Sequence, residues 1–243
     1  MSDKVLCVVS GGLDSITMAY DLRSKGWEVS TVSFDYGQRH RKELDYAVYH
    51  AGGNHWRHDI VDLHNLAGLL NSALTGYSSI PEGHYAAENM KATIVPNRNA
   101  ILLSVACGIA VSRGARYIAT AVHGGDHYIY PDCRPDFLTR LSAAFEMGNP
   151  NFKGIVAPYI DKDKNYIAQR AVYLDYDWRR TWSCYKGGDK HCGRCGTCVE
   201  RMEALWSTHL HRDDMGHSVR RDFLFPENLY EDNTYWEQVT ENA

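Results

Sequence analysis

The first candidate site in the sequence is a glycine-rich loop formed by Ser10, Gly11, Gly12, Leu13, Asp14 and Ser15. Glycine has no Cβ atom, so the backbone N–H groups of such a loop can approach phosphate oxygens. A helix that follows the loop points its positive end at the same anion. Because Asp14 repels phosphate, its expected roles are capping that helix or holding Mg²⁺. The alternative is an ordinary tight turn in which Asp14 only caps the helix.

The order of residues in this loop resembles the PP-loop of ATP pyrophosphatases. These enzymes split ATP into AMP and pyrophosphate to activate a carboxyl or carbonyl oxygen. The loop is neither a Walker loop, which needs Gly-Lys-Ser/Thr, nor the Gly-x-Gly-x-x-Gly loop of dinucleotide-binding proteins. The resemblance favours adenylation of a small carboxylate over transfer of the γ-phosphate.

The second candidate site is a set of cysteines with the spacing C-x7-C-x2-C-x2-C: Cys184, Cys192, Cys195 and Cys198. Four thiolates at this spacing can close a tetrahedral Zn²⁺ site. Such a site leaves no position for a substrate, so we expect the zinc to be structural. The alternatives are an iron–sulfur cluster and buried cysteines without metal.

Composition narrows the classes of protein that fit. The 243 residues are 44% hydrophobic and 23% charged, with a net charge of −4. This balance is typical of a globular domain and argues against stable nucleic-acid binding. The first apolar run has five residues, too few for a signal peptide or a membrane span. We therefore expect a cytoplasmic protein, in which seven cysteines indicate metal binding or reactivity and not disulfides.

Hydrophobic patterns predict an α/β fold with a parallel sheet, because a strand, a loop, a helix and a second strand follow one another from residue 5 to residue 34. Strands are expected over residues 5–9, 28–34 and 116–122. Helices are expected over residues 14–25, 41–51, 97–111 and 135–147, and a loop over 78–91. The predicted organisation is a nucleotide-binding domain over 1–180, a zinc-binding segment over 181–206 and an extension of unknown role over 207–243.

With both motifs identified, the chain resembles the QueC family of 7-cyano-7-deazaguanine synthases up to about Trp206. The resemblance also rests on FDYGQRH at 34–40, VPNRN at 95–99, HGGDH at 123–127, YPDCRP at 130–135 and TWSCYKGG at 181–188. It implies ATP-dependent conversion of 7-carboxy-7-deazaguanine and ammonia into the nitrile through an amide, as in queuosine biosynthesis. Each half of the reaction releases AMP and pyrophosphate. The resemblance further implies a Rossmann-like fold of the PP-loop type and a homodimer.

The matched segments contain the candidate substrate-binding residues: Arg39, Asn97, Arg98, Asn99, His123, Asp126, His127, Tyr130, Asp132, Cys133 and Arg134. The guanidinium groups of Arg39 and Arg98 can clamp a carboxylate or phosphates. Of Asn97 and Asn99, one is expected to cap the following helix and the other to contact ligand. The alternative for these residues is a capped helix with a surface arginine.

The other candidates are expected to act on ammonia, metal or the base. Asp126, with His123 and His127, is expected to orient ammonia, bind Mg²⁺ or contact the base edge. Asp132 and Arg134 lie on a proline-bounded loop, and a carboxylate there suits the amino and ring N–H donors of the deazaguanine. Between them, Cys133 is a contact or, alternatively, a covalent nucleophile.

The expected catalytic residues are Asp14, Arg98, Asp126 and Lys164. In the family a lysine corresponds to Lys164, where it can neutralise charge at the α-phosphate. The family usually continues with Ala-Glu after this lysine, whereas this chain has Asn165 and Tyr166.

The second departure from the family pattern is the extension at the C-terminus, where the family generally ends soon after Trp206. The extension contains His209, His211, His217, Tyr230, Tyr235 and Trp236. Its aromatic residues suit docking on a subunit or a protein partner. The extension keeps open an alternative function, in which the same adenylate joins the deazaguanine to a protein amine, as in antiviral defence. A third alternative is a nucleotide-binding scaffold without catalysis.

Overall fold

A computed structural model describes residues 2–70, 72–76, 79–84 and 88–207 of the chain. Its centre is a five-stranded sheet with the order β3-β2-β1-β4-β5, in which every neighbouring pair is parallel. The strands are β1 (Lys4–Val8), β2 (Glu28–Asp35), β3 (His58–Asp62), β4 (Tyr117–Ala119) and β5 (Gly154–Val156). The predicted α/β fold with a parallel, Rossmann-like sheet is therefore confirmed.

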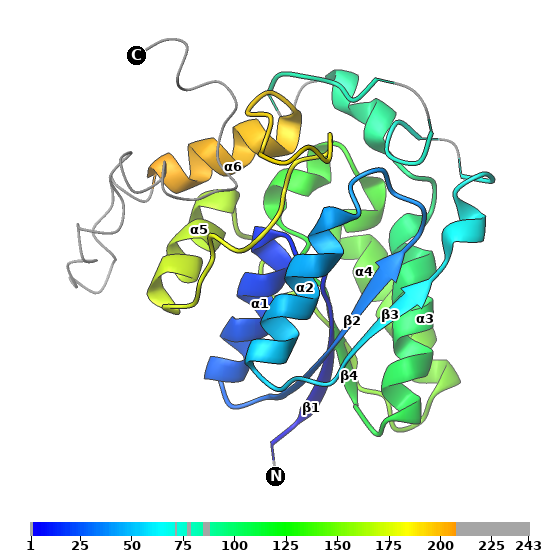
Figure 1. Cartoon of the computed structure of the whole chain (residues 1–243). Helices are drawn as coiled ribbons and strands as arrows, with labels where there is room; N and C mark the ends of the chain where they lie inside the picture. The colour runs from blue at the N-terminus through cyan, green and yellow to red at the C-terminus, as the bar shows by residue number, and fades with distance from the viewer. Residues whose placement is uncertain (1, 71, 77–78, 85–87, 208–243) are drawn as a thin grey trace.

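Helices cover both faces of this sheet. In Figure 1, α1 (Leu13–Ser24) and α2 (Lys42–Gly53) lie in front of it, and α3 (Arg98–Ser112) and α4 (Pro135–Gly148) lie behind. Two further helices, α5 (Lys164–Tyr173) and α6 (Gly196–Ser207), pack against each other, and α5 also packs against α1. Because both faces are covered, the middle of β1 is fully buried, and Val5, Leu6 and Cys7 have no exposed surface. This explains the continuous apolar run of its sequence.

Several sequence predictions differ from the observed elements. The helices expected near 14, 41, 97 and 135 are confirmed as α1 to α4, but β4 ends at Ala119 and not at residue 122. Sequence patterns missed β3, β5, α5 and α6. β3 and β5 are short, and the cysteines of the metal motif mask the helical pattern of α6. In the described part of the expected loop, Glu88–Thr93 forms a 3-10 helix.

The strand order creates a crevice at one edge of the sheet. From β1 the sheet extends through β2 and β3 on one side, and through β4 and β5 on the other. In open parallel sheets, ligands bind beyond the carboxyl ends of the strands at such a switch point. The glycine-rich loop follows β1 directly, so the fold places this loop at the crevice.

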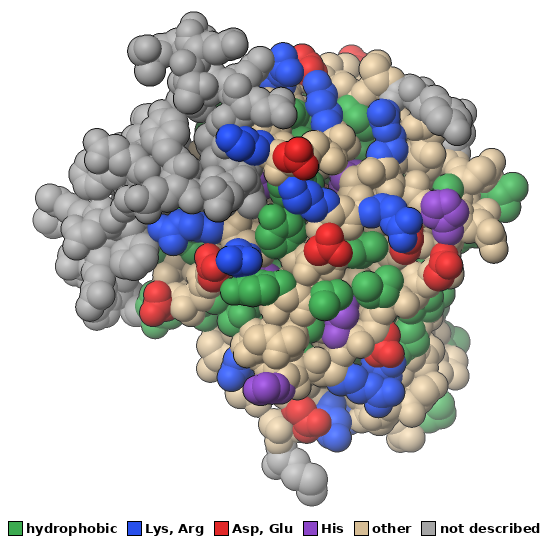
Figure 2. All heavy atoms as spheres, viewed as in Figure 1, with side chains coloured by type: hydrophobic (Ala, Val, Ile, Leu, Met, Phe, Trp, Pro, Cys, Tyr) green, Lys and Arg blue, Asp and Glu red, His purple; other side chains and the backbone are tan. Residues whose placement is uncertain are grey.

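The surface in Figure 2 carries Lys and Arg side chains interspersed with Asp and Glu side chains, in keeping with the chain's small net charge of −4. Among the described helices, none combines the length and apolar content that a membrane span requires. The histidines of the C-terminal extension, and the aromatic residues expected to dock there, lie outside the described residues.

Gly11 lies where α2 comes closest to the glycine-rich loop. Its φ angle is +94°, and a Cβ atom at this position would lie 1.8 Å from the carbonyl oxygen of Glu43. No side chain can fit between these two backbone segments. Gly11 is therefore required for the packing of α2, in addition to any approach of its N–H group to phosphate.

Substitution at Gly11 should destabilise the protein far more than a matched substitution at Gly26. Gly26 has a similar φ of +86°, but no atom lies within 4 Å of the position that a Cβ atom would take there. We expect Gly26→Ala to lower the free energy of unfolding by about 1–2 kcal/mol, the strain of a left-handed residue. In Gly11→Ala the new Cβ atom also collides with the backbone of Glu43. The free energy of unfolding, measured with urea, should therefore fall at least twice as much as in Gly26→Ala. Equal losses in the two variants would contradict this interpretation.

Candidate active site

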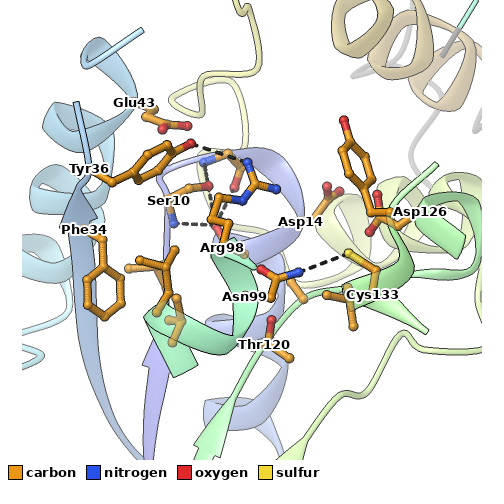
Figure 3. A pocket seen from close by; sticks show the side chains of 18 of the residues that line it. Ser10, Asp14, Phe34, Tyr36, Glu43, Arg98, Asn99, Thr120, Asp126 and Cys133 are labelled. Carbon is orange, nitrogen blue, oxygen red and sulfur yellow. Dashed lines mark hydrogen bonds between the residues drawn. The ribbon is translucent and has the colours of Figure 1, made fainter. Parts of the chain in front are cut away.

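A pocket of about 240 Å³ lies at the carboxyl ends of β1, β2 and β4 (Figure 3). The predicted site residues that line it are Ser10, Gly12, Asp14, Ser15, Arg98, Asn99, Asp126, Tyr130 and Cys133. Residues Thr120, Ala121 and Val122, which were expected to continue β4, line it as well. The fold thus brings the glycine-rich loop together with segments about a hundred residues further along the chain.

Hydrogen bonds within the glycine-rich loop fix its two serines. The hydroxyl oxygen of Ser15 accepts the Ser10 N–H at 3.1 Å, and that of Ser10 accepts the Gly12 N–H at 3.1 Å. The N-cap of α1 is Gly12, and no side chain caps this helix. The expectation that Asp14 caps α1 is therefore wrong. Without a side-chain cap, the first N–H groups of α1 are oriented to receive an anion.

Asp14 is paired instead with Lys164. The Nζ atom of Lys164 lies 2.5 Å from Oδ2 of Asp14 and 3.4 Å from Oε2 of Glu200. Burial alone would lower the pKa of Lys164, but the carboxylates of Asp14 and Glu200 outweigh it and raise the pKa. The lysine is therefore charged. It is the first residue of α5, whose N-cap Asp163 accepts the Tyr166 N–H at 2.8 Å.

His123 faces the same group of carboxylates. Its Nε2 atom lies 3.7 Å from Asp126 Oδ1, 3.8 Å from Glu200 Oε1 and 3.9 Å from Asp14 Oδ2. A capping box orients the ring, because Nδ1 accepts the Gly125 N–H and Asp126 accepts the His123 N–H. With Nδ1 acting as an acceptor, a neutral ring carries its proton on Nε2, toward the carboxylates.

Glu200 is the functional candidate that sequence reasoning missed. It lies on α6, between the cysteine motif and the C-terminal extension. Its contact with Lys164 arises from the packing of α5 on α6, and its contact with His123 from the segment that follows β4. A glutamate within a polar helical stretch carries no local signal of such a role.

Arg98 lies in the middle of the pocket. Its Nη1 atom donates to the Tyr36 hydroxyl at 3.5 Å, and its Cζ atom lies 5.9 Å from the ring centres of both Tyr36 and Tyr130. Arg39, the second expected cation of the clamp, has an exposed side chain and does not line the pocket. The pocket is lined instead by its neighbour His40 and by Glu43.

The start of α3 also differs from expectation. Neither Asn97 nor Asn99 caps the helix with its side chain, and the Asn99 N–H donates instead to Asp132 Oδ2 at 3.0 Å. The Asn99 side chain contacts the Asp132 carbonyl oxygen and Cys133 Sγ, each at 3.2 Å. Asp132 therefore ties its loop to α3 and does not line the pocket.

The other residues of this loop have lesser roles than expected. Burial, assisted by Asp126 and Asp132, raises the pKa of the Cys133 thiol. A thiol that stays protonated is a poor nucleophile, so Cys133 is better suited to contact than to covalent catalysis. Arg134 donates to the His127 carbonyl oxygen at 3.1 Å, and neither side chain lines the pocket.

The four cysteines of the metal motif lie together. One sulfur from each of Cys184, Cys192, Cys195 and Cys198 lies within 4.8 Å of all the others. The sulfurs of Cys192 and Cys198 are 3.9 Å apart. Tetrahedral Zn²⁺ with Zn–S bonds of about 2.3 Å separates its sulfurs by about 3.8 Å. The cluster therefore fits one Zn²⁺ better than an iron–sulfur cluster, in which the thiolates bind different irons.

The metal-binding segment packs directly on the glycine-rich loop. The Trp182 N–H donates to the Gly11 carbonyl oxygen at 2.9 Å, and Lys42 Nζ lies 4.2 Å above the Trp182 ring. Tyr185 lines the pocket. Together with Glu200, these contacts make the segment a wall of the pocket and not a separate appendage.

His40 and Glu43 form a buried pair on the opposite wall. Burial, with Arg98 and Arg39, lowers the pKa of His40 to about 3. Burial raises the pKa of Glu43 to about 8, against the effects of Gln38 and Arg98. Both groups are therefore neutral at pH 7 in the absence of ligand.

Comparisons with known proteins agree with this geometry. A family model described as "Queuosine biosynthesis protein QueC" matches residues 4–209. The 7-cyano-7-deazaguanine synthase of Rhizobium johnstonii is 50% identical over 208 residues, which cover 83% of this chain and 87% of the relative. The synthase of the same name from Brucella anthropi is 45% identical over 241 residues and covers 98% of both chains. The C-terminal extension thus has a counterpart in a named synthase.

Loss of one metal-binding thiolate should disturb the whole site. We expect the purified protein to contain one zinc per chain, and Cys195→Ser to be insoluble or to lack zinc, because metal binding is coupled to folding. Cys107→Ser serves as the control, since Cys107 is a buried cysteine of α3 outside the cluster. Elemental analysis and thermal unfolding measure both effects. A soluble Cys195→Ser protein with full zinc content would contradict the assignment.

The pair of His40 and Glu43 should make stability depend on pH. Between pH 6.5 and 8 folded Glu43 retains a proton that the unfolded chain has lost, so the free energy of unfolding falls as pH rises. Over this range the free energy of unfolding should fall by at most about 2 kcal/mol, since one proton contributes about 1.4 kcal/mol per pH unit. Below pH 6.5 unfolded His40 gains a proton that folded His40 refuses, which destabilises the fold as pH falls.

Glu43→Gln should remove the loss of stability between pH 6.5 and 8. Asp45→Asn, an exposed change on the same helix, should retain it. Urea unfolding at a series of pH values gives the comparison. An undiminished loss in the Glu43→Gln protein would show that Glu43 ionises normally.

Proposed function

Because the chain belongs to the QueC family, we propose that it is an ATP-dependent carbon–nitrogen ligase. It converts 7-carboxy-7-deazaguanine and ammonia into 7-cyano-7-deazaguanine and releases AMP and pyrophosphate. The observation that carries this proposal is the position of Lys164 against Asp14, beside the glycine-rich loop and within reach of the pocket. A loop that holds pyrophosphate next to a charged lysine is suited to chemistry at the α-phosphate.

The residues around Asp14 fit Mg²⁺. In the described part of the chain, Asp14 Oδ1 is buried and has no hydrogen-bond partner. The carboxylate of Asp126 lies nearby, since both groups face His123 Nε2. Carboxylate oxygens are ligands that Mg²⁺ prefers, and the bound ion supplies positive charge to the phosphate oxygens. Asp14, with Asp126, would hold this ion, and Lys164 neutralises charge at the α-phosphate.

Arg98 holds the substrate for the first step. Its guanidinium group binds the 7-carboxylate, one oxygen of which attacks the α-phosphorus while pyrophosphate leaves. Ammonia then displaces AMP to give the amide, and the amide oxygen is adenylated in turn by a second ATP. Loss of the second AMP, with loss of the remaining N–H protons, leaves the nitrile. His123 and Asp126 are suited to orient ammonia and to accept its protons.

The proposal extends to a homodimer with a structural Zn²⁺ in the cysteine cluster, as the family resemblance implies. It also extends to a cytoplasmic location, as the short first apolar run predicts. No observation on the described residues favours a protein amine in place of ammonia as the acceptor. The relative from Brucella anthropi, which covers 98% of this chain, bears the name of the synthase, and this supports ammonia.

The proposed reaction is tested by mass spectrometry of the products. The purified protein, ATP, Mg²⁺, 7-carboxy-7-deazaguanine and ammonium should yield the nitrile, and AMP release should require both the acid and ammonium. Recovery of the amide alone, or the absence of any reaction with ammonium, would contradict the proposal.

Replacement of Lys164 should abolish AMP formation while the protein stays folded. Loss of one charge-stabilising group at a developing anion typically lowers the rate by about 10²- to 10³-fold, so Lys164→Ala should lose at least this much. Lys162→Ala is the matched control, because Lys162 lies two residues away, pairs with Asp161 and is more exposed. Circular dichroism checks the fold. Normal turnover by the Lys164→Ala protein would show that another cation serves the α-phosphate.

A further inference from the structure

The deazaguanine ring needs a partner for its pyrimidine edge. This edge presents two adjacent donors, N1–H and the 2-amino group, which suit the two oxygens of one carboxylate. Asp132 was expected to supply that carboxylate. It instead accepts the Asn99 N–H at 3.0 Å and does not line the pocket. The remaining candidates for such a partner are the other carboxylates of the pocket wall.

Three carboxylates line the pocket in the described part of the chain: Asp14, Glu43 and Asp126. Asp14 is paired with Lys164, and Asp126 accepts the His123 N–H. Both lie on the same side of Arg98 (Figure 3). Glu43 lies with Tyr36 on the opposite side of Arg98 (Figure 3). Of these three lining carboxylates, only Glu43 thus lies apart from Lys164 and His123.

Neighbouring side chains hold one oxygen of Glu43 and leave the other unbound. Oε1 accepts the Gln38 side-chain amide at 3.3 Å and lies 3.5 Å from His40 Nε2. Gln38 is itself fixed, because it also donates to the Phe34 carbonyl oxygen at 3.1 Å and accepts the Tyr36 N–H at 2.9 Å. Among the described residues, no hydrogen bond to Oε2 is formed. This oxygen is therefore available to a donor from a molecule bound in the pocket.

Aromatic side chains also line the pocket and can hold a flat ring. Phe34, Tyr36 and Tyr185 line the pocket, and the ring of His40, the neighbour of Glu43, lies 5.1 Å from that of Tyr185. Tyr185 comes from the metal-binding segment, so this segment helps to close the ring site. A planar heterocycle between such side chains buries its faces while its polar edge meets the carboxylate.

We propose that Glu43 recognises the 2-amino-4-oxopyrimidine edge of the substrate and thereby selects a deazaguanine over other 7-carboxy-7-deazapurines. This inference rests on the proposed function and names its specificity residue. With Glu43 at the pyrimidine edge, the 7-carboxylate would lie toward Arg98 and Asp14, on the side of Lys164 (Figure 3). The two donors of the substrate, together with Arg98, favour the ionised form of Glu43, so its carboxyl group releases the proton when the ring binds. Adenine, in contrast, presents a donor beside an acceptor, which the ionised carboxylate cannot match.

The test compares 7-carboxy-7-deazaguanine with 7-carboxy-7-deazahypoxanthine, which lacks only the 2-amino group. Loss of one hydrogen bond to a charged group should lower kcat/KM of the wild-type protein by about 10- to 100-fold. In Glu43→Gln the amide N–H₂ opposes the substrate donors. The variant should therefore lose about 100-fold in kcat/KM on the guanine substrate, mainly through KM, and should prefer neither substrate by more than about 3-fold.

Controls separate recognition of the ring from other effects. Asp45→Asn removes the same charge from an exposed position of α2 and should keep the wild-type preference, and Glu43→Asp should keep part of it. The KM for ATP should stay within about 2-fold of the wild-type value in all variants. The reason is that loss of a contact with the deazaguanine changes the KM for the deazaguanine and not the KM for ATP. A rise in the KM for ATP, with the preference between the acids retained, would assign Glu43 to the nucleotide and overturn the proposal.

If Glu43→Gln does not fold, the preference of the wild-type protein between the two acids still tests the proposal. Equal kcat/KM for the two acids would overturn the proposal. If the wild-type protein forms no nitrile from either acid, the proposed function fails. Calorimetric binding of the two acids in the presence of a non-hydrolysable ATP analogue still tests Glu43, and equal affinities would overturn its role.

Discussion

The hydrogen bond from the Trp182 N–H to the Gly11 carbonyl oxygen joins the metal-binding segment to the loop that follows β1. At the same loop residue, α2 approaches so closely that no Cβ atom fits. The loop is therefore fixed between two elements that are far apart in the sequence. From the same segment come Tyr185, which lines the pocket, and Glu200, which contacts Lys164. A structural Zn²⁺ would thus stabilise the site as a whole and not only its own segment.

Charge in the site is arranged around Lys164. Three carboxylates, those of Asp14, Asp126 and Glu200, surround this lysine and His123. Like charges at such distances destabilise one another unless cations lie between them. The lysine supplies this charge in the free protein, and Asp14 Oδ1 still lacks a partner in the part of the chain that is described. Binding of ATP with Mg²⁺ would let the lysine and the carboxylates each face an opposite charge.

The sequence predicted those features whose geometry is local. The apolar run of β1, the loop from Ser10 to Ser15 and the four cysteines each depend on near neighbours, and all three were found. Features that depend on tertiary contacts were not found from the sequence. Glu200 and Glu43 are ordinary helical glutamates in sequence, and only packing brings them to the site.

Two residues show the opposite error. Asp132 and Arg39 lie within matched motifs, but one ties its loop to α3 and the other has an exposed side chain. A motif indicates which segment lies at a site, whereas the direction of each side chain depends on backbone contacts around it.

The central chemical claim is that the carboxylate oxygens leave the substrate on AMP. Substrate labelled with ¹⁸O in both carboxylate oxygens tests this claim most directly, by mass spectrometry of the products. Each of the two AMP molecules formed per nitrile should carry one ¹⁸O, and label found in phosphate, pyrophosphate or ADP would contradict adenylation.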